Sequence, residues 1–137
     1  MNIPNFAIYV CLGFAVMLTA CNKEKISEPS AKPDKNTSTL ETPKKSLTYQ
    51  MELLKTGDVE KLKACFTERL RSSITTESVS KGKQELSSYT LDDLFASEER
   101  GEYEGSQTCN VKMKNGRTLT TFVLQDGQWL ADTVWFK

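Results

Sequence analysis

Apolar residues between positions 47 and 70 recur at the spacing of two amphipathic helices. Leu47, Met51 and Leu54 share one face of the first predicted helix. Gly57 follows, where a residue with left-handed backbone dihedrals commonly ends a helix, and Asp58 is placed to cap the next one. The second predicted helix has an apolar stripe, with Cys65 beside it, made of Val59, Leu62, Phe66 and Leu70.

The next segment is polar and carries weaker helix signals. Residues 71–80 are rich in serine and threonine, which is typical of a loop or a frayed helix. A third helix is predicted over residues 76–87, although Gly82 lowers its helix propensity. Thr90 and Asp93 have the spacing of a capping box and predict a short helical turn.

From residue 94 onward the apolar pattern changes from helical spacing to the alternation of strands. Cys109, Val111 and Met113 alternate with polar residues and predict a strand with one buried face. Asn115-Gly116 follows and is a strong hairpin signal, because it suits a turn in which both central residues have positive φ.

The end of the chain predicts a further hairpin and a last strand. Asp126-Gly127 supplies the turn, and the strand covers residues 129–136. Apolar side chains fall on both of its faces, with Trp129 and Trp135 on one and Phe136 on the other. We therefore expect this strand to be central in its sheet and covered on both sides.

These elements predict an α+β domain over residues 44–137. Two or three helices would pack on the concave side of a curved antiparallel sheet of three to four strands. Gly101 and Gly105 interrupt the region before Cys109 and predict bulges or a loop between the first two strands. The segment is long enough to bury a single hydrophobic core.

The first 43 residues have a different character. Residues 1–20 contain no charged side chain, and residues 6–18 are an apolar run interrupted only by Gly13. A membrane span needs about 20 helical residues, so this run is typical of a signal peptide. Residues 21–43 contain lysines, acidic residues and three prolines but no aromatic residue, and we expect them to form a disordered tether.

A short motif follows the apolar run directly. Leu18, Thr19, Ala20 and Cys21 resemble the lipobox of bacterial lipoproteins, in which an aliphatic residue and two small residues precede a cysteine. The resemblance implies cleavage between Ala20 and Cys21, acylation of Cys21 and attachment to membrane lipid. Asn22 stands where Asp would retain such a protein in an inner membrane, which favours the outer membrane. The alternative is an ordinary cysteine at the end of an uncleaved anchor.

The folded part also resembles a known superfamily. The segments 56–58 (TGD), 89–94 (YTLDDL) and 127–130 (GQWL) are similar to those of nuclear-transport-factor-2-like domains, in particular those of small bacterial envelope lipoproteins. This resemblance implies a cone-shaped fold, which is also described as cystatin-like. The resemblance does not indicate a function, because proteins with this fold include enzymes, ligand carriers and assembly proteins.

The amino-acid composition excludes several classes of partner and of catalytic or metal site. Among 137 residues, 18 Lys and Arg balance 18 Asp and Glu, which argues against a nucleic-acid partner because such partners require a basic face. The chain has no histidine, so nucleophile systems and metal sites that depend on histidine are excluded. No cofactor or metal is expected.

Two cysteines lie within the predicted domain. Cys65 is beside the helical stripe and Cys109 is on the apolar face of a strand, so both can point into one core. An exported protein sits in a disulfide-permissive compartment, and one hypothesis is a structural disulfide between them. The other is that they are two small buried apolar residues that never meet.

The last strand supplies the candidate chemistry. Asp132 lies between apolar residues, where burial would raise its pKa and suit it to act as a general base. The alternative for Asp132 is a position near a sheet edge, paired with Lys or Arg. A candidate apolar pocket combines it with aromatic residues that could equally be core, namely Phe122, Trp129 and Trp135.

These features favour a membrane-anchored envelope lipoprotein with a small, non-enzymatic binding or assembly domain. Its partner would be an envelope protein or a small apolar ligand. One alternative is an isomerase or lyase that uses Asp132 in a conical pocket. Another is an envelope protein whose domain scaffolds or neutralises a second protein.

Overall fold

The computed structural model describes residues 39–136. The predicted signal peptide, the lipobox-like residues Leu18 to Cys21, and Asn22 lie outside the described residues. The helices are α2 (Pro43–Thr56), α3 (Val59–Ala64), the 3-10 helix η1 (Glu68–Ser73), α4 (Thr76–Leu86) and α5 (Leu91–Leu94). The strands are β1 (Ser97–Tyr103), β2 (Ser106–Lys112), β3 (Thr118–Gln125) and β4 (Gln128–Ala131).

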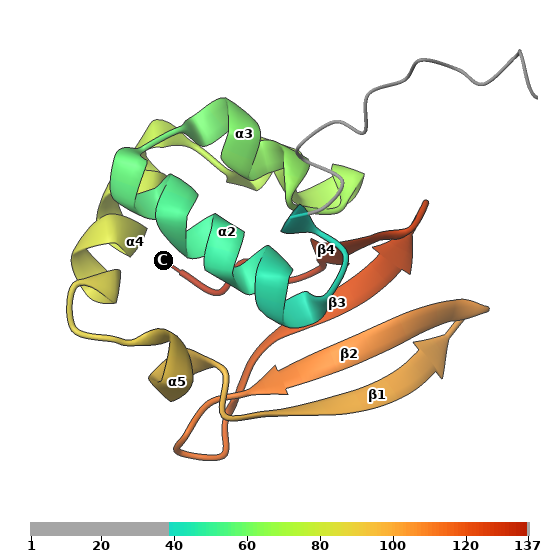
Figure 1. The fold of residues 1–137 in the computed structure, drawn as a ribbon. Helices are drawn as coiled ribbons and strands as arrows, with labels where there is room; N and C mark the ends of the chain where they lie inside the picture. Colours follow the sequence, from blue (N-terminus) through green and yellow to red (C-terminus); the bar gives the residue numbers. More distant parts are fainter. Residues whose placement is uncertain (1–38, 137) are drawn as a thin grey trace, which may run out of the picture. The chain divides into compact units, whose positions relative to one another are not determined.

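The predicted α+β class is confirmed. Helices come first in the chain, and the strands form one antiparallel sheet in the order β1-β2-β3-β4. Figure 1 shows α2, α3 and α4 gathered beside β3 and β4, whereas the β1–β2 hairpin projects away from them. The helical half of the domain therefore packs mainly against the last strand and the segment that follows it.

The ends of the helices follow the local signals in the sequence. Thr42 caps α2 by accepting from the Lys45 N–H, and Gly57 ends it with a φ of 78°. Asp58 accepts from the Lys61 N–H and caps α3, as predicted. The third helix is confirmed over Thr76–Leu86.

Gly82 has a packing role within α4. A Cβ at this position would lie 2.7 Å from a ring carbon of Phe136, closer than side-chain atoms approach. Phe136 is 1% exposed, so its ring has no room to move outward. The glycine that weakens the helix in isolation is therefore what allows the C-terminal segment to pack against it.

The turns between strands agree with the sequence in part. Asp126 and Gly127 have φ of 50° and 77°, as expected for the predicted two-residue hairpin. At Asn115-Gly116 only the glycine has positive φ, and the register shifts between Val111 and Lys112. The expectation of two left-handed residues there is wrong, because the turn is wider and is closed by a bond from the Met113 N–H to the Arg117 carbonyl.

The two glycines before β2 have different roles. Gly105 forms a two-residue turn with Glu104, where φ is 78° and 50°, and joins β1 directly to β2. Gly101 lies in regular strand opposite Thr108. The predicted bulge or loop is therefore a tight turn at Gly105 alone.

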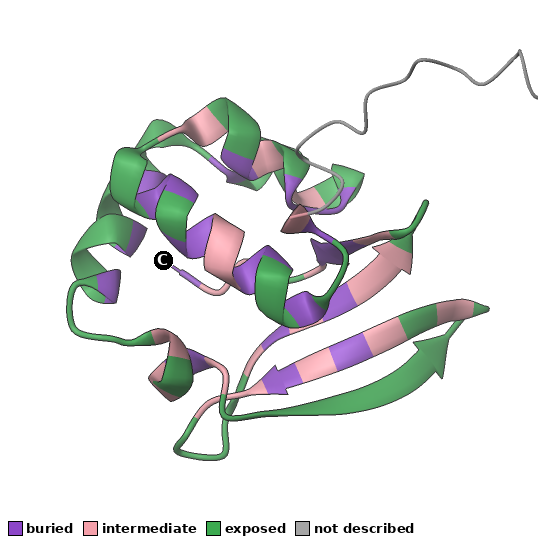
Figure 2. Cartoon of the chain, viewed as in Figure 1, coloured by how far each residue is buried: buried purple, intermediate pink, exposed green. Residues whose placement is uncertain are grey.

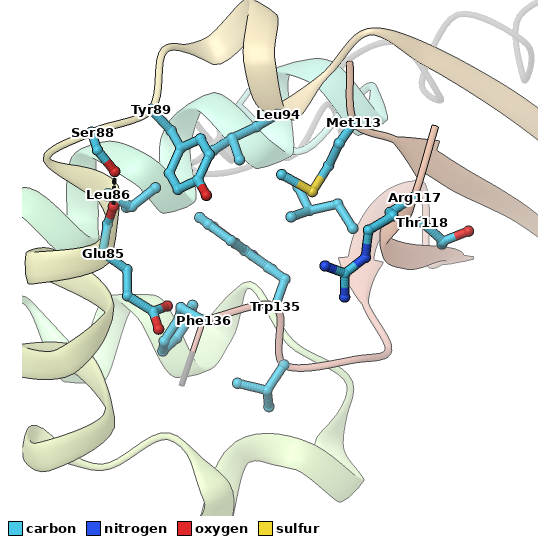
Figure 3. A pocket seen from close by; sticks show the side chains of 12 residues that line it. Glu85, Leu86, Ser88, Tyr89, Leu94, Met113, Arg117, Thr118, Trp135 and Phe136 are labelled. Atoms are coloured by element: carbon cyan, nitrogen blue, oxygen red, sulfur yellow. Dashed lines mark hydrogen bonds between the residues drawn. The ribbon is translucent and has the colours of Figure 1, made fainter. Parts of the chain in front are cut away.

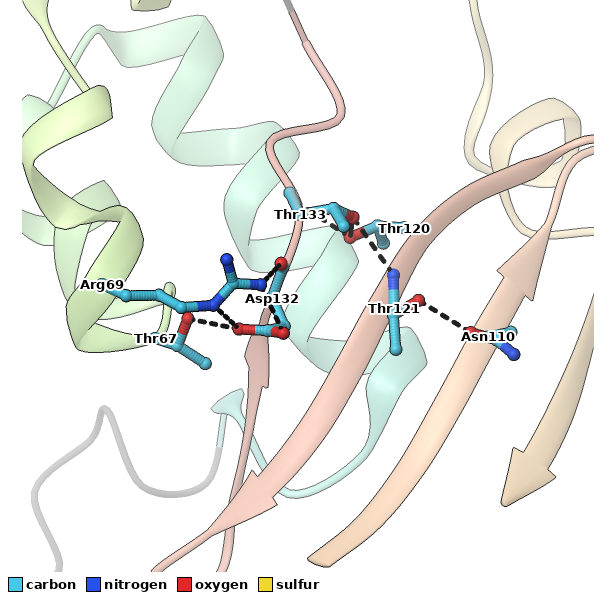
Figure 4. A network of polar contacts seen from close by, with 7 residues as sticks. All are labelled: Thr67, Arg69, Asn110, Thr120, Thr121, Asp132 and Thr133. Atoms are coloured by element: carbon cyan, nitrogen blue, oxygen red, sulfur yellow. Dashed lines mark hydrogen bonds and ion pairs between the residues drawn. The ribbon is translucent and has the colours of Figure 1, made fainter. Parts of the chain in front are cut away.

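The last strand is shorter than predicted and lies at an edge. β4 ends at Ala131 and is the outermost strand, so the expectation of a central strand over residues 129–136 is wrong. Beyond it the Thr133 hydroxyl, rather than a backbone carbonyl, accepts from the Thr121 N–H at 3.3 Å (Figure 4). The ladder continues by one bond, from the Asp132 N–H to the Thr121 carbonyl at 2.8 Å, and the Thr133 side chain replaces the reciprocal bond where the chain turns into the core.

The outer edge of β4 is closed by segments from the helical half. The Trp129 N–H donates to the Leu40 carbonyl at 2.8 Å, and the Trp129 carbonyl accepts from the Ser46 hydroxyl at 2.8 Å. Leu40 is 3% exposed. The folded domain therefore begins by Leu40, before the tether boundary predicted at Pro43.

The same edge explains where the second helix ends. The Ala131 N–H donates to the Cys65 carbonyl at 2.9 Å, and the Ala131 carbonyl accepts from the Thr67 N–H at 3.0 Å. Phe66 between them forms a parallel bridge with Ala131. The single stripe predicted from Val59 to Leu70 is wrong, because the chain leaves the helix after Ala64 to bind this edge.

A buried glutamine connects these segments. Gln50 is fully buried, and its amide nitrogen lies 3.3 Å from the Ser46 hydroxyl and 3.4 Å from the Cys65 carbonyl. Its amide oxygen accepts from the Trp135 indole N–H at 2.8 Å. Gln50 thereby fixes the C-terminal segment to α2, and every polar atom of its side chain has a partner.

Burial is uneven across the sheet (Figure 2). Cys109, Phe122 and Ala131 lie opposite one another on successive strands, and all three are fully buried beneath the helical side. The other face is half-exposed, as at Asn110 and Thr121. All seven residues of β1 are exposed, so the sheet has one closed edge and one open edge.

Candidate functional site

A groove opens where three parts of the domain meet: the α4–α5 connection, the β2–β3 hairpin and the C-terminal segment after β4. Its volume is about 560 Å³ (Figure 3). Its lining is Glu85, Leu86, Ser88, Tyr89, Leu94, Met113, Arg117, Thr118, Leu119, Val134, Trp135 and Phe136. Most of the lining side chains are aromatic or aliphatic, but polar atoms supply about as much of the exposed lining as apolar atoms do.

The groove has a rigid floor. Trp135 lies in the middle of the lining in Figure 3, and its ring is only partly buried. Its indole N–H is held by Gln50, so the ring has a fixed position while one part of it remains accessible. Phe136 beside it is 1% exposed and makes edge-to-face contacts with Trp135 and Phe66.

The walls differ in charge. Glu85 from α4 and Arg117 from the β2–β3 turn lie on different sides of Trp135 (Figure 3). Glu85 already has an interaction partner. The Arg117 guanidinium has no hydrogen-bond or ion-pair partner within residues 39–136. Tyr89, 47% exposed, forms part of the rim.

The pocket predicted from Phe122, Trp129, Asp132 and Trp135 is not formed. Phe122 and Trp129 are core residues with exposures of 0% and 4%, and the Arg100 guanidinium covers the Trp129 ring at 4.8 Å. Asp132 lies outside the lining of the groove. The structure places only Trp135 in the groove, because the chain leaves strand geometry after Ala131.

Asp132 belongs to an ion pair (Figure 4). Its carboxylate accepts from the Arg69 guanidinium at 2.6 and 2.8 Å and from the Thr67 hydroxyl at 2.6 Å. The hydrogen bonds from Arg69 have the largest effect and lower the pKa of Asp132. Burial opposes them, and the hydrogen bond from Thr67 lowers the pKa further. The expectation of a raised pKa is wrong, and the alternative of a carboxylate paired with arginine is confirmed.

The two cysteines of the domain are free thiols. The Cys65 Sγ faces the Lys61 carbonyl at 3.5 Å, and the Cys109 Sγ lies 3.9 Å from a carboxylate oxygen of Glu98. Burial raises the pKa of Cys65 to about 12, and burial with the Glu98 charge raises that of Cys109 to about 11. Neither is a thiolate at neutral pH.

The register of the sheet explains why no disulfide joins them. Cys109 lies opposite Phe122, Phe122 lies opposite Ala131, and Ala131 is bonded to Cys65 beyond the edge. Neighbouring strands are about 4.8 Å apart, so the two cysteine Cα atoms are roughly 14 Å apart. A disulfide requires Cα atoms within about 7 Å, so the predicted Cys65–Cys109 bond does not form.

Sequence reasoning missed two residues of the groove. Arg117 directly follows Asn115-Gly116, so the sequence predicts that it lies at the end of a turn. Nothing in the sequence indicates that this turn lies beside Trp135. Tyr89, in the segment 89–94, was not among the residues predicted to line the pocket. Among the residues that the structure describes, no group of three or more Cys, Asp or Glu side chains could hold a metal ion.

Comparisons with known proteins add nothing to this description. No family model matches the chain, and neither a curated protein nor a solved structure matches it. Within residues 39–136, every helix is too short or too polar to cross a bilayer.

The Asp132–Arg69 pair predicts a pH-dependent contribution to stability. Asp132→Asn should lower the free energy of unfolding by about 1–2 kcal/mol at pH 7, because it weakens charge-assisted hydrogen bonds that are partly exposed. Since the folded pKa is depressed, the contribution is present above about pH 4 and is lost as the pH falls below that value.

Urea denaturation of both proteins between pH 2 and 7, a range chosen around the ordinary pKa of aspartate, measures this difference. Asp126→Asn is the matched control, since Asp126 is an exposed turn residue at a φ that Asn tolerates. A difference between wild type and Asp132→Asn that stays constant over the whole pH range contradicts the assigned role.

Proposed function

We propose that this chain is a lipid-anchored envelope protein whose folded domain binds a small apolar ligand in the groove over Trp135, without transforming it. The observation that supports this function is the groove, which is about 560 Å³ in volume and has a fixed, partly accessible aromatic floor. Cavities of this size, lined by aromatic and aliphatic side chains with a few polar groups, are typical of small-molecule sites.

The anchoring part of the proposal is supported by sequence. Leu18, Thr19, Ala20 and Cys21 resemble a lipobox directly after an apolar run, and acylated Cys21 would bind membrane lipid. A mature lipoprotein carries several acyl chains, which hold a protein stably whereas a single chain does not. Asn22 supports the outer membrane as the location.

We also propose that the domain has the cone-shaped fold of nuclear-transport-factor-2-like or cystatin-like proteins. The helices gather on one side of the antiparallel sheet, and the groove lies where the helical half meets the β2–β3 hairpin (Figures 1 and 3). This arrangement supports the finer fold assignment and agrees with the similarity of segments 56–58, 89–94 and 127–130.

A second candidate function is binding of another envelope protein, either in assembly or to neutralise it. The specific observation in its favour is β1, which is exposed along its length and forms an open sheet edge. An isomerase or lyase using Asp132 has less support, because that carboxylate is paired with Arg69 and does not line the groove.

The anchor is tested by replacing its attachment site. Cys21→Ala should abolish palmitate labelling and release the protein from membranes, because the thiol is the only acceptor that the lipobox supplies. Cys65→Ala is the matched control and should leave labelling unchanged, since Cys65 is a buried thiol of the domain. Continued labelling of Cys21→Ala, or a native protein that begins at Met1, would refute the anchor.

Ligand binding is tested with a neutral aromatic probe, 3-phenylpropanol, added to the full chain in non-ionic detergent. The indole N–H signal of Trp135 should shift on titration, whereas that of Trp129, which is 4% exposed, should stay in place. Tyr89→Ala should weaken binding about 5- to 30-fold, since it removes about 1–2 kcal/mol of apolar contact.

Tyr103→Ala is the control for this experiment, because Tyr103 is 68% exposed on β1 and does not line the groove. It should leave the affinity unchanged. No saturable shift of the Trp135 signal, or an equal loss of affinity in both tyrosine variants, counts against a ligand site in the groove.

A further inference from the structure

We propose that the groove selects a small carboxylate with an apolar body, binding the carboxylate on Arg117 and the apolar body on Trp135. This inference rests on the proposed ligand-binding function and specifies the chemistry of the ligand. It comes from one cation that has no side-chain partner within residues 39–136 and lies beside an aromatic floor.

The backbone of Arg117 is fixed. Its carbonyl accepts from the Met113 N–H at 2.8 Å, and its own N–H donates to the Asn115 side-chain oxygen at 3.0 Å. Both bonds belong to the turn between β2 and β3, and Met113 itself lines the groove. The guanidinium therefore extends from a rigid support into the lining, as Figure 3 shows.

Arg117 also differs from the neighbouring cations. Lys112 donates to the Thr118 hydroxyl at 2.9 Å and lies 3.4 Å from a Glu99 carboxylate oxygen. Lys114 lies on the same turn but is not part of this lining. Within residues 39–136, Arg117 is the one cationic side chain in the lining of the groove, and its guanidinium donors have no hydrogen-bond or ion-pair partner there.

A carboxylate matches these donors better than a neutral head group does. The planar guanidinium presents parallel N–H groups that bind both oxygens of a carboxylate at once. The other charged residue of the lining, Glu85, is acidic and disfavours an anion on its own side of the groove. The two residues together orient a bound anion toward the hairpin.

The side chains beside Arg117 determine which chemical group the rest of the ligand should carry. Met113, Leu119, Val134 and Trp135 are all partly exposed in the groove. Contact with these side chains removes apolar surface from water, which is favourable for an aromatic or aliphatic group and not for a polar one. A purely inorganic anion would lose this contribution.

The test compares 3-phenylpropionate with 3-phenylpropanol, which share the same body and differ in the head group. In the full chain, titration of the Trp135 indole N–H signal gives the dissociation constant of each. The carboxylate should bind about tenfold or more tightly than the alcohol, as expected for a charge-assisted hydrogen bond. Arg117→Gln should remove this preference and leave the affinity for the alcohol within about twofold.

Lys114→Gln is the matched control, because it removes the same charge from the same turn at a residue outside the lining. It should leave the preference for the carboxylate intact. Equal binding of acid and alcohol to the wild type, or an equal loss of preference in both variants, overturns the carboxylate assignment while the ligand site stands. Binding of neither compound overturns the carboxylate assignment and the proposed function together.

Discussion

The outer edge of β4 is the constraint on which the rest of the domain depends. Trp129 and Ala131 each use both backbone groups on this edge, and their partners come from the segment before α2, from α2 itself and from the end of α3. An open edge would leave these groups without partners in a buried region, where each costs about 1–3 kcal/mol. Closing it instead ties the helical half of the chain to the last strand, and Gln50 extends the connection to Trp135.

This closed edge also determines where the groove lies. Because β4 is held on both sides, the chain can leave the sheet after Ala131 and turn Trp135 and Phe136 into the space beside α4. Gln50 then holds the indole with its ring exposed to the groove. Within residues 39–136 no segment covers the opposite edge, β1, which carries four charged residues among seven, a composition that discourages pairing with other strands. The closed edge builds the proposed ligand site, whereas the charges along β1 count against a protein partner that would add a strand there.

The sequence predicted the features that depend on neighbouring residues. The stripe of Leu47, Met51 and Leu54, the end of α2 at Gly57 and the turn at Asp126-Gly127 are local, and all three are confirmed. The predictions from the sequence were wrong where contacts between residues far apart in the chain determine the structure. The second helix ends early because Cys65 and Thr67 bind Ala131. The pairing of Asp132 with Lys or Arg was one of the two predictions for this residue and is confirmed, but its partner, Arg69 of η1, could not be named from the sequence. For the same reason only Trp135 of the predicted pocket lines the groove: no local pattern shows which strand forms an edge or which turn faces it.

Native-state hydrogen exchange of backbone amides tests the closed edge most directly. The amides of Trp129 and Ala131 should exchange as slowly as those of the interior strand β3, because both are bonded to the helical half. On the open edge, the amides of Glu98, Arg100 and Glu102 should exchange far faster, since they alternate with residues that are bonded to β2. Exchange of Trp129 and Ala131 as fast as that of the three β1 amides would contradict the closed edge and the arrangement of the groove derived from it.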